Sequence, residues 1–396
     1  MTEISRVVDG LKPSGIRDFF DLVMGMDDVI SLGVGEPDFV TPRNIREAAI
    51  QSLEDGYTNY TSNQGMPELR ETISGYLEDK HGISYDPDSE ILITVGVSEA
   101  MDLAMRALLN PDDHVLIPTP CYVSYKPTAL MAGASVSTLE TSMDTGFRLT
   151  PEMIEKEITP NTKILTLNYP ANPTGTSYER DELEEIAEVC REHDVIVFSD
   201  EIYGDLTYER DHVPLPTIPG MKDHTLYLNG FSKAHAMTGF RIGYAAGPEE
   251  IISAMTKIHQ YTMLCVPTSS QFAATEALKN SESAVKSMRD AYHTRRDFLL
   301  GRLHDIGLPC ARPEGAFYAF PSIEPTGMEP GEFCRELLES KKVATVPGNA
   351  FGPGGEQHIR ISYATDRELL ETAFDRMEEF IEERSLSQPE QKSSTT

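Results

Sequence analysis

The chain has 396 residues, which corresponds to two or three domains at about 150 residues each. Its 34 Lys and Arg residues against 64 Asp and Glu residues give a net charge of −30, and no basic tract interrupts this charge, so we expect no nucleic-acid partner. The chain is 39% hydrophobic, enough for a large core, yet no apolar run approaches the ~18 residues of a membrane span, so we expect no membrane partner.

Along the chain, residues 1–45 are rich in Gly and Pro and read as loops that join a smaller domain. Residues 46–280 are predicted to form a large α/β domain. Between about residues 91 and 247 short, continuously apolar runs alternate with amphipathic stretches, which is typical of strands buried on both faces between helices. The runs are Ile91–Val95, His114–Pro118, Lys163–Leu167, Val195–Phe198, Thr225–Leu228 and Ile242–Ala246. The clearest helical pattern between them is Tyr178–His193. We therefore predict a mostly parallel sheet sandwiched by helices.

The pattern changes after residue 280. Ser281–Gly307 reads as one long helix, followed by short strand candidates and two further helical stretches, so residues 281–384 are predicted to form a smaller α+β domain. The strand candidates are Ala316–Phe320 and His358–Tyr363, and the helical stretches are Pro330–Lys341 and Asp366–Glu383. Residues 385–396 carry almost no apolar side chain and are predicted to be a disordered tail.

Two features bear on location and metals. The five cysteines are odd in number and far apart, without a C-x-x-C pair, which fits neither a disulfide framework nor a zinc site. The N-terminus lacks the basic stretch and apolar run of a secretion signal. We expect a cytoplasmic protein without a metal site.

Unusual polar residues follow the predicted strands, where ligands of open α/β sheets bind. The sequence after each strand in turn contains Gly96-Val97-Ser98, Tyr122, Asn172, Asp200 with Tyr203, and Ser232-Lys233, and Arg241 follows eight residues after the lysine. A lysine kept from bulk water can attack a carbonyl carbon as an amine. A helix that opens with Gly-Val-Ser, with an arginine beside it, can hold a phosphate. A buried carboxylate can keep a heteroaromatic nitrogen protonated. These are the requirements of pyridoxal 5′-phosphate.

Six segments in order carry a resemblance over nearly the whole chain. They are Gly33–Phe39 (GVGEPDF), Tyr57–Tyr60, Asn172–Gly175 (NPTG), Ser199–Tyr203 (SDEIY), Ser232–Gly243 (SKAHAMTGFRIG) and Ile359–Ser362. With them the sequence resembles the fold-type I pyridoxal-phosphate enzymes, and among these the class I aminotransferases. The resemblance implies amino-group transfer between an L-amino acid and a 2-oxo acid such as 2-oxoglutarate.

The resemblance also implies roles for single residues. Lys233 would form the Schiff base with the cofactor, Asp200 would pair with the ring nitrogen, and Tyr203 with Asn172 would bind the ring oxygen. Tyr122 would stack on the ring. The phosphate would be held by Val97, Ser98, Arg241 and, from a neighbouring subunit, Tyr60, which implies a homodimer. Arg360 would bind the substrate carboxylate, with Gly35, Tyr122 and Asn172 nearby. Many relatives have Ser or Thr three residues before the lysine, where this chain has Gly230, so Ser232 is the substitute candidate for the phosphate.

Two other functions compete with this interpretation. A PLP-dependent β-elimination lyase would use the same lysine. More distantly, Gly96-Val97-Ser98-Glu99-Ala100 is close to the G-x-S-x-G nucleophile elbow, which would make Ser98 the nucleophile of an α/β-hydrolase-like enzyme.

The only indication of the amino donor is the absence of a cationic residue from the loop that follows Ile91–Val95. This loop carries Ser98 and Glu99 but no Lys or Arg that could bind the side-chain carboxylate of aspartate, although Arg17, Lys126 or another subunit could supply one. The missing cation therefore favours an enzyme with broad donor specificity, or one for aromatic or neutral amino acids, over one for aspartate.

Overall fold

The computed structural model describes residues 3–11 and 26–387. A sheet of seven strands forms its centre, in the order β2-β8-β7-β6-β5-β3-β4. The strands are β2 (Ile91–Thr94), β3 (His114–Thr119), β4 (Ser135–Glu140), β5 (Thr162–Asn168), β6 (Ile196–Asp200), β7 (Thr225–Gly230) and β8 (Gly243–Ala246). Only β8 runs antiparallel to its neighbours. The prediction of a mostly parallel sheet is therefore confirmed.

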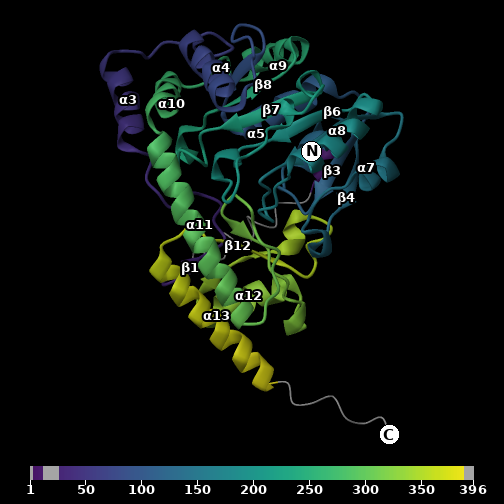
Figure 1. The fold of residues 1–396 in the computed structure, drawn as a ribbon, viewed down its shortest axis with the longest axis vertical. Coiled ribbons are helices and arrows are strands. Elements are labelled where there is room, and N and C mark those ends of the chain that lie inside the picture. Colours follow the sequence, from purple (N-terminus) through teal and green to yellow (C-terminus); the bar gives the residue numbers. More distant parts are fainter. Residues whose placement is uncertain (1–2, 12–25, 388–396) are drawn as a thin grey trace.

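Apart from β4, the strands are largely apolar because their two faces belong to two different cores. Leu92, Phe198 and Leu226 pack with α5 (Gly96–Leu108), α6 (Tyr125–Met131) and α9 (Glu249–Thr262). Their neighbours Ile93 and Val197 point the other way. One end of that second face is covered by α4 (Pro67–His81) and α10 (Thr268–Asn280), and the other by α7 (Pro151–Glu157) and α8 (Arg180–Glu192). Helices thus lie on both sides of the sheet (Figure 1).

The sequence pattern missed β4. This strand lies at the edge of the sheet and pairs only with β3 among the described strands. Its sequence, Ser-Val-Ser-Thr-Leu-Glu, contains only two apolar residues, as expected for a strand of which most is only half-buried. The continuous apolar run by which we recognised the other strands is typical only of strands covered on both faces.

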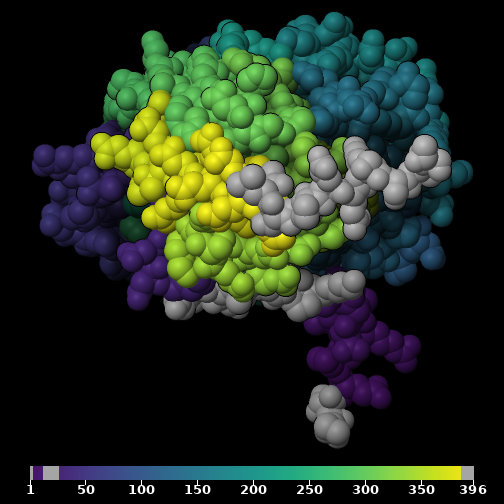
Figure 2. Space-filling view, turned by 90° about the horizontal axis from the view of Figure 1, so that it is seen from below, coloured from purple at the N-terminus to yellow at the C-terminus, as the bar shows by residue number. Residues whose placement is uncertain are grey.

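The C-terminal part of the chain contains smaller sheets. β9 (Tyr318–Ala319), β11 (Val346–Pro347) and β12 (Ile359–Ser362) form an antiparallel sheet, while β1 (Ile30–Ser31) pairs in parallel with β10 (Val343–Ala344). The remaining helices here are α11 (Glu282–Asp305), α12 (Pro330–Lys341) and α13 (Arg367–Ser387). The 24-residue α11 runs from the large sheet down to this part (Figure 1). From below, α13 in yellow lies against α11 and the yellow-green segments (Figure 2).

The domain limits at residues 45 and 280 stay a prediction. The pairing of β1, from the N-terminal segment, with β10 of the C-terminal part agrees with it. At the C-terminus, α13 continues to Ser387, into the segment that we expected to be a disordered tail from residue 385. The end of the helix before residue 385 is rich in Glu and Arg, which favour its continuation by one more turn. Residues 388–396 lie outside the described residues.

Shorter elements complete the description. The other helices are α1 (Arg6–Gly10) and α3 (Arg43–Glu54), and the 3₁₀ turns are Met143–Thr145, Gly204–Leu206, Leu215–Thr217, Lys222–His224, Thr238–Phe240, Glu324–Thr326 and Gly348–Phe351. Within the described ranges, no helix combines the length and the apolar character needed to cross a membrane.

Candidate active site

A cavity of about 730 Å³ lies where β5, β6 and β7 end and where α5 begins. Every residue that the sequence analysis assigned to the site lines this cavity, except Tyr60. These residues are Gly35, Val97, Ser98, Tyr122, Asn172, Asp200, Tyr203, Ser232, Lys233, Arg241 and Arg360. Because β8 is antiparallel, the residues just before it, including Arg241, reach the same rim as the carboxyl ends of the parallel strands.

Lys233 follows β7 and is held by the N-terminal segment. Its Nζ donates a hydrogen bond to the carbonyl oxygen of Gly35 at 2.6 Å and lies 5.7 and 5.8 Å from the ring centres of Tyr203 and Phe317. Burial, and next the charge of Arg360, lower the pKa of Lys233 to about 8. A larger fraction of this lysine is therefore a neutral, nucleophilic amine at neutral pH than for a surface lysine.

Asp200 ends β6 and is almost fully buried. Burial raises its pKa to about 6, although Tyr125 Oη donates to Oδ2 at 2.6 Å and thereby favours the charged form. The backbone N–H of Ile202 donates to Oδ1 at 3.3 Å. A raised pKa means that the carboxylate form of Asp200 is more basic than usual. It would therefore be a strong hydrogen-bond acceptor for a cationic group in the cavity.

Tyr203 and Asn172 present polar groups to the cavity from two loops. The hydroxyl groups of Tyr203 and Tyr318 lie 2.9 Å apart, and burial raises the pKa of Tyr203, so its hydroxyl stays protonated. Asn172 Oδ1 accepts from Arg360 Nη1 at 2.9 Å. Within the described part of the chain no hydrogen bond engages the Nδ2 group of Asn172, which can therefore donate into the cavity.

Arg360 lies on β12 and is buried between aromatic rings. Its guanidinium carbon is 4.6 Å from the ring centre of Tyr318 and 4.8 Å from that of Phe351. Nη2 donates to the carbonyl oxygen of Gly33 at 2.7 Å, while Nε is buried without a partner among the described residues. Burial lowers the pKa of Arg360, yet it remains a cation at neutral pH. A carboxylate is the ligand that this guanidinium favours.

The first turn of α5 forms an anion site together with Arg241. Val97 and Ser98 line the cavity, and no side chain caps the helix N-terminus. A Cβ atom on Gly96, whose φ is +76°, would lie 2.9 Å from Arg241 Nη2, so only glycine lets the guanidinium come this close. Free backbone N–H groups, a helix N-terminus and an arginine together suit a phosphate.

Gly230, the departure from the usual pattern, has a steric reason. A Cβ atom at Gly230 would lie 2.9 Å from the Cα atom of Gly243 on the adjacent strand β8. A serine or threonine at this position would therefore displace the backbone. Ser232 lines the cavity instead, in agreement with its choice as the substitute.

Two tyrosines differ in where the structure places them. Tyr122 lines the cavity, with its ring 5.7 Å from that of Tyr125 in an edge-on arrangement. Tyr60 is 81% exposed and does not line the cavity of its own chain. Tyr60 therefore takes no part in the cavity of its own chain.

Comparison with known proteins identifies the family. The family model of aminotransferase class I and II matches residues 27–377. An aspartate aminotransferase of Pyrococcus abyssi (strain GE5 / Orsay) is 45% identical over 96% of this chain and 98% of its own length. An aromatic-amino-acid aminotransferase 2 of Thermococcus litoralis is 42% identical over 97% and 99%. The crystal structure of an aromatic aminotransferase from Pyrococcus horikoshii OT3 matches with a TM-score of 0.89 at 43% identity, over 94% of this chain and 100% of that one.

The chain belongs to the class I and II aminotransferases. It is a pyridoxal-phosphate-dependent enzyme that moves an amino group between an amino acid and a 2-oxo acid. The alternative of β-elimination finds no support among these relatives. The hydrolase alternative also fails on geometry, because no histidine lines the cavity among the described residues and no hydrogen bond joins Ser98 to a base there.

The residues of this aminotransferase fit its cofactor. The half-buried amine of Lys233 suits the aldehyde, the buried carboxylate of Asp200 suits the ring nitrogen, and the uncapped turn of α5 with Arg241 suits the phosphate. The unpartnered Nε of Arg360 leaves capacity for a carboxylate at the other side of the cavity. No group in this set is left without a plausible ligand.

Sequence reasoning assigned no role to several other polar residues of the cavity, among them Tyr125, Asn168 and Tyr318. Asn168 Nδ2 donates to the carbonyl oxygen of Asp200 at 2.7 Å, and its Oδ1 accepts from the N–H of Asn172 at 2.9 Å, which ties β5 to β6 and to the loop. Tyr125 follows Tyr122 at helical spacing, a signal that we could have used. Nothing in the sequence distinguishes Tyr318 from its aromatic neighbours Phe317 and Phe320.

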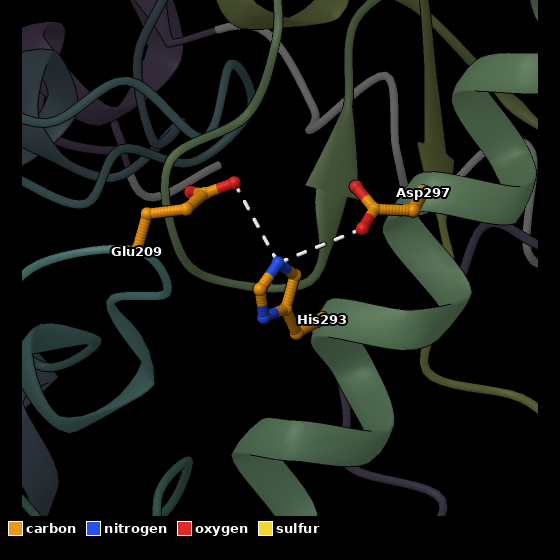
Figure 3. Close-up of side chains that lie close together, drawn as sticks. All are labelled: Glu209, His293 and Asp297. Carbon is orange, nitrogen blue, oxygen red and sulfur yellow. Dashed lines mark ion pairs between the residues drawn. The ribbon is translucent and has the colours of Figure 1, made fainter.

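One further cluster lies outside the cavity. Glu209, His293 and Asp297 lie together at the surface of α11 (Figure 3). Both carboxylates accept hydrogen bonds from Arg296 and Arg312. Arg296 lowers the pKa of Glu209 to about 2. The cluster is therefore an ion-pair network with its charges already balanced, and it provides no argument for a metal ion.

Proposed function

We propose that this aminotransferase takes an aromatic or neutral L-amino acid as donor at least as well as aspartate, and a 2-oxo acid such as 2-oxoglutarate as acceptor. The carrying observation is the charge of the cavity. Lys233, Arg241 and Arg360 are the only cations among the described residues that line it, and each has a task in binding cofactor or α-carboxylate. No further cation is left there for a side-chain carboxylate.

The surroundings of the donor support this choice. Tyr122, Tyr318 and Val34 line the cavity and offer apolar surface to a side chain. Lys126 is exposed and does not line the cavity, and Arg17 lies outside the described residues. One of the similar proteins is named an aromatic and another an aspartate aminotransferase, so both donors belong in the test.

We assign the residues as follows. When bound, pyridoxal phosphate supplies an aldehyde that takes up amino groups and a ring that accepts electrons from Cα. Asp200 holds the proton on the ring nitrogen, while Tyr203 and Asn172 donate to the ring oxygen. Val97, Ser98, Ser232 and Arg241 bind the phosphate, and Tyr122 stacks on the ring.

At the substrate, Arg360 binds the α-carboxylate and thereby fixes the orientation of Cα toward Lys233. The Nζ atom of Lys233 then accepts the Cα proton and passes it to the cofactor. This proton transfer requires that the amine is neutral for part of the time. Gly35 covers the site from the N-terminal segment, where its carbonyl oxygen accepts from Lys233.

A panel of donors with 2-oxoglutarate tests the substrate proposal. We expect kcat/KM for phenylalanine or tyrosine to equal or exceed that for aspartate. A strict preference for aspartate would contradict it. Borohydride reduction of the holoenzyme followed by peptide mapping tests the lysine, since labelling at any lysine but Lys233 would overturn the assignment.

We also propose a homodimer in which Tyr60 reaches the phosphate of the partner's cavity. Exposed apolar side chains gather where the loop of residues 57–63 meets the junction of α9 and α10. Hydrogen bonds from Asn63 to the carbonyl oxygen of Leu264 and from Thr268 to that of Asn59 join the two segments. The exposed side chains are Tyr57, Tyr60, Tyr261, Met263 and Leu264. A surface of this kind is typical of an interface. Sedimentation of the holoenzyme checks it, and a fully active monomer would contradict it.

We place the enzyme in the cytoplasm. All five cysteines are free thiols, which suits a reducing compartment. Fractionation of cells followed by immunodetection checks this location.

A further inference from the structure

A carboxylate and an imidazole with no task in the transfer reaction lie buried together behind the first turn of α5. Glu99 Oε1 lies 2.8 Å from Nδ1 of His259 on α9. His259 is completely buried, and the Glu99 side chain is only 10% exposed. His259 Nε2 has no partner among the described residues, so the ring is best satisfied as the neutral form that donates from Nδ1 to Glu99.

The other oxygen of Glu99 holds the start of the helix. Oε2 accepts a hydrogen bond from the backbone N–H of Val95, the residue that precedes the helix, at 2.5 Å. Val95 has no side-chain acceptor for the next N–H groups. Glu99 thus satisfies the N–H before the turn and leaves those of Val97 and Ser98 to the cavity that they line.

The placement of this charge matters because it lies within one turn of the proposed phosphate site. A carboxylate at a helix N-terminus commonly binds the free N–H groups itself and would then occupy the place of a phosphate. Here His259 and Val95 take both oxygens of Glu99. The same turn also positions Arg241, whose Nη2 atom lies so close to Gly96 that a Cβ atom there would come within 2.9 Å.

We propose that Glu99, held by His259, is a positioning residue for the cofactor phosphate: it fixes the Val95–Val97 turn so that the N–H groups of Val97 and Ser98 face the cavity, while its own charge is kept out of that place. The proposal rests on the phosphate role proposed above for Val97, Ser98 and Arg241. It predicts an effect confined to the phosphate end of the cofactor.

Binding of two ligands to the apoenzyme separates this role from a general structural one. Pyridoxal 5′-phosphate and pyridoxal share the ring and the aldehyde, and only the first carries the phosphate. We expect Glu99→Ala and His259→Leu to weaken binding of pyridoxal phosphate by about tenfold, the effect of losing a buried hydrogen bond to a charged group, and to leave pyridoxal binding unchanged.

Matched variants keep the hydrogen bonds. Glu99→Gln retains an acceptor for Val95, and its amide N–H can donate to Nδ1 of His259 once the ring carries its proton on the unpartnered Nε2 instead. His259→Asn retains a donor near the position of Nδ1. Both variants should therefore bind pyridoxal phosphate within about twofold of the wild type. Glu99→Asp keeps the charge but is one methylene too short to reach both partners, and should behave like Glu99→Ala. It replaces that variant if thermal unfolding shows that the alanine apoenzyme does not fold.

Two results would overturn the proposal: unchanged affinity for pyridoxal phosphate in Glu99→Asp and His259→Leu, or an equal loss for pyridoxal phosphate and pyridoxal. Failure of the proposed function would look different, because the wild-type enzyme would then not be labelled at Lys233 by borohydride.

Discussion

Burial changes the acid–base chemistry of Lys233 and Asp200 in opposite directions, and each change suits the proposed task. Water stabilises charged groups, so a buried amine loses its proton more easily and a buried carboxyl group keeps its proton longer. The lysine remains able to act as an amine and the aspartate remains able to hold a proton. Their sequence neighbours predict neither shift, because the burial comes from segments far away in the chain.

The lowered pKa of Lys233 predicts its reactivity in the apoenzyme. Reaction of Lys233 with cyanate, followed by peptide mass mapping, should titrate with a midpoint near pH 8, because only the neutral amine reacts. Exposed lysines of the same sample, such as Lys126, provide the control. A midpoint for Lys233 that coincides with theirs would contradict the effect of burial.

The raised pKa of Asp200 predicts how the apoenzyme's stability depends on pH. Between the ordinary pKa of 3.8 and the folded value of about 6, the folded state holds a proton that the unfolded state has lost. The free energy of unfolding should therefore fall as pH rises through this window, relative to Asp200→Asn, by on the order of 2–3 kcal/mol.

Denaturant unfolding of the two apoenzymes at pH 4.5 and 6.5 measures this difference. Asparagine keeps an acceptor for Tyr125, so the comparison isolates the ionisation. Equal pH dependence of the two proteins would show that Asp200 titrates normally.

At the scale of elements, close backbone contact between β7, β8 and the first turn of α5 shapes the phosphate site. Gly230 and Gly243 face each other across the two strands, and a Cβ atom on Gly243 would lie 2.9 Å from the backbone nitrogen of Val97. Glycine at both positions lets the strands and the helix approach this closely. The chain thus loses a hydroxyl at residue 230 but brings Arg241 and the free N–H groups together.

Gly230→Ser tests this packing. Although serine would supply a hydroxyl group at this position, we expect destabilisation of roughly 1–3 kcal/mol because its Cβ atom meets the backbone of Gly243. Thermal unfolding of the holoenzyme measures the change. Gly75→Ala on the exposed side of α4 is the control, where a Cβ atom meets nothing and helix propensity should add roughly 0.5–1 kcal/mol. A Gly230→Ser enzyme as stable as the wild type would contradict the steric argument.

At the scale of the whole molecule, the cavity combines segments that lie hundreds of residues apart. Gly35 comes from the N-terminal segment, Lys233 from the large sheet and Arg360 from β12. Hydrogen bonds connect them, since Lys233 donates to Gly35 and Arg360 donates to Gly33 and Asn172. The described chain nevertheless leaves Tyr60 exposed, and a second subunit is the partner that we propose for it.

Hybrid dimers test this sharing. Lys233→Ala and Tyr60→Ala subunits, each of low activity alone at limiting cofactor, should regain activity when unfolded and refolded together. One site of each hybrid then has both residues, which predicts about a quarter of the wild-type activity, since half of the dimers are hybrids with one intact site each. A mixture no more active than the sum of its parents would contradict the shared site.

The sequence by itself determined the type of fold and half of the residues that line the cavity. Strands buried on both faces must be continuously apolar, and ligands of such sheets bind at the strand ends, so local patterns were enough to place Asp200 and Lys233 on one rim. Only the tertiary structure decided the rest: the half-buried edge strand β4, the antiparallel course of β8, the contact of Tyr125 with Asp200 and the buried pair of Glu99 and His259. These features depend on which distant segments remove a residue from water and supply its hydrogen-bond partner, and no local pattern contains that information.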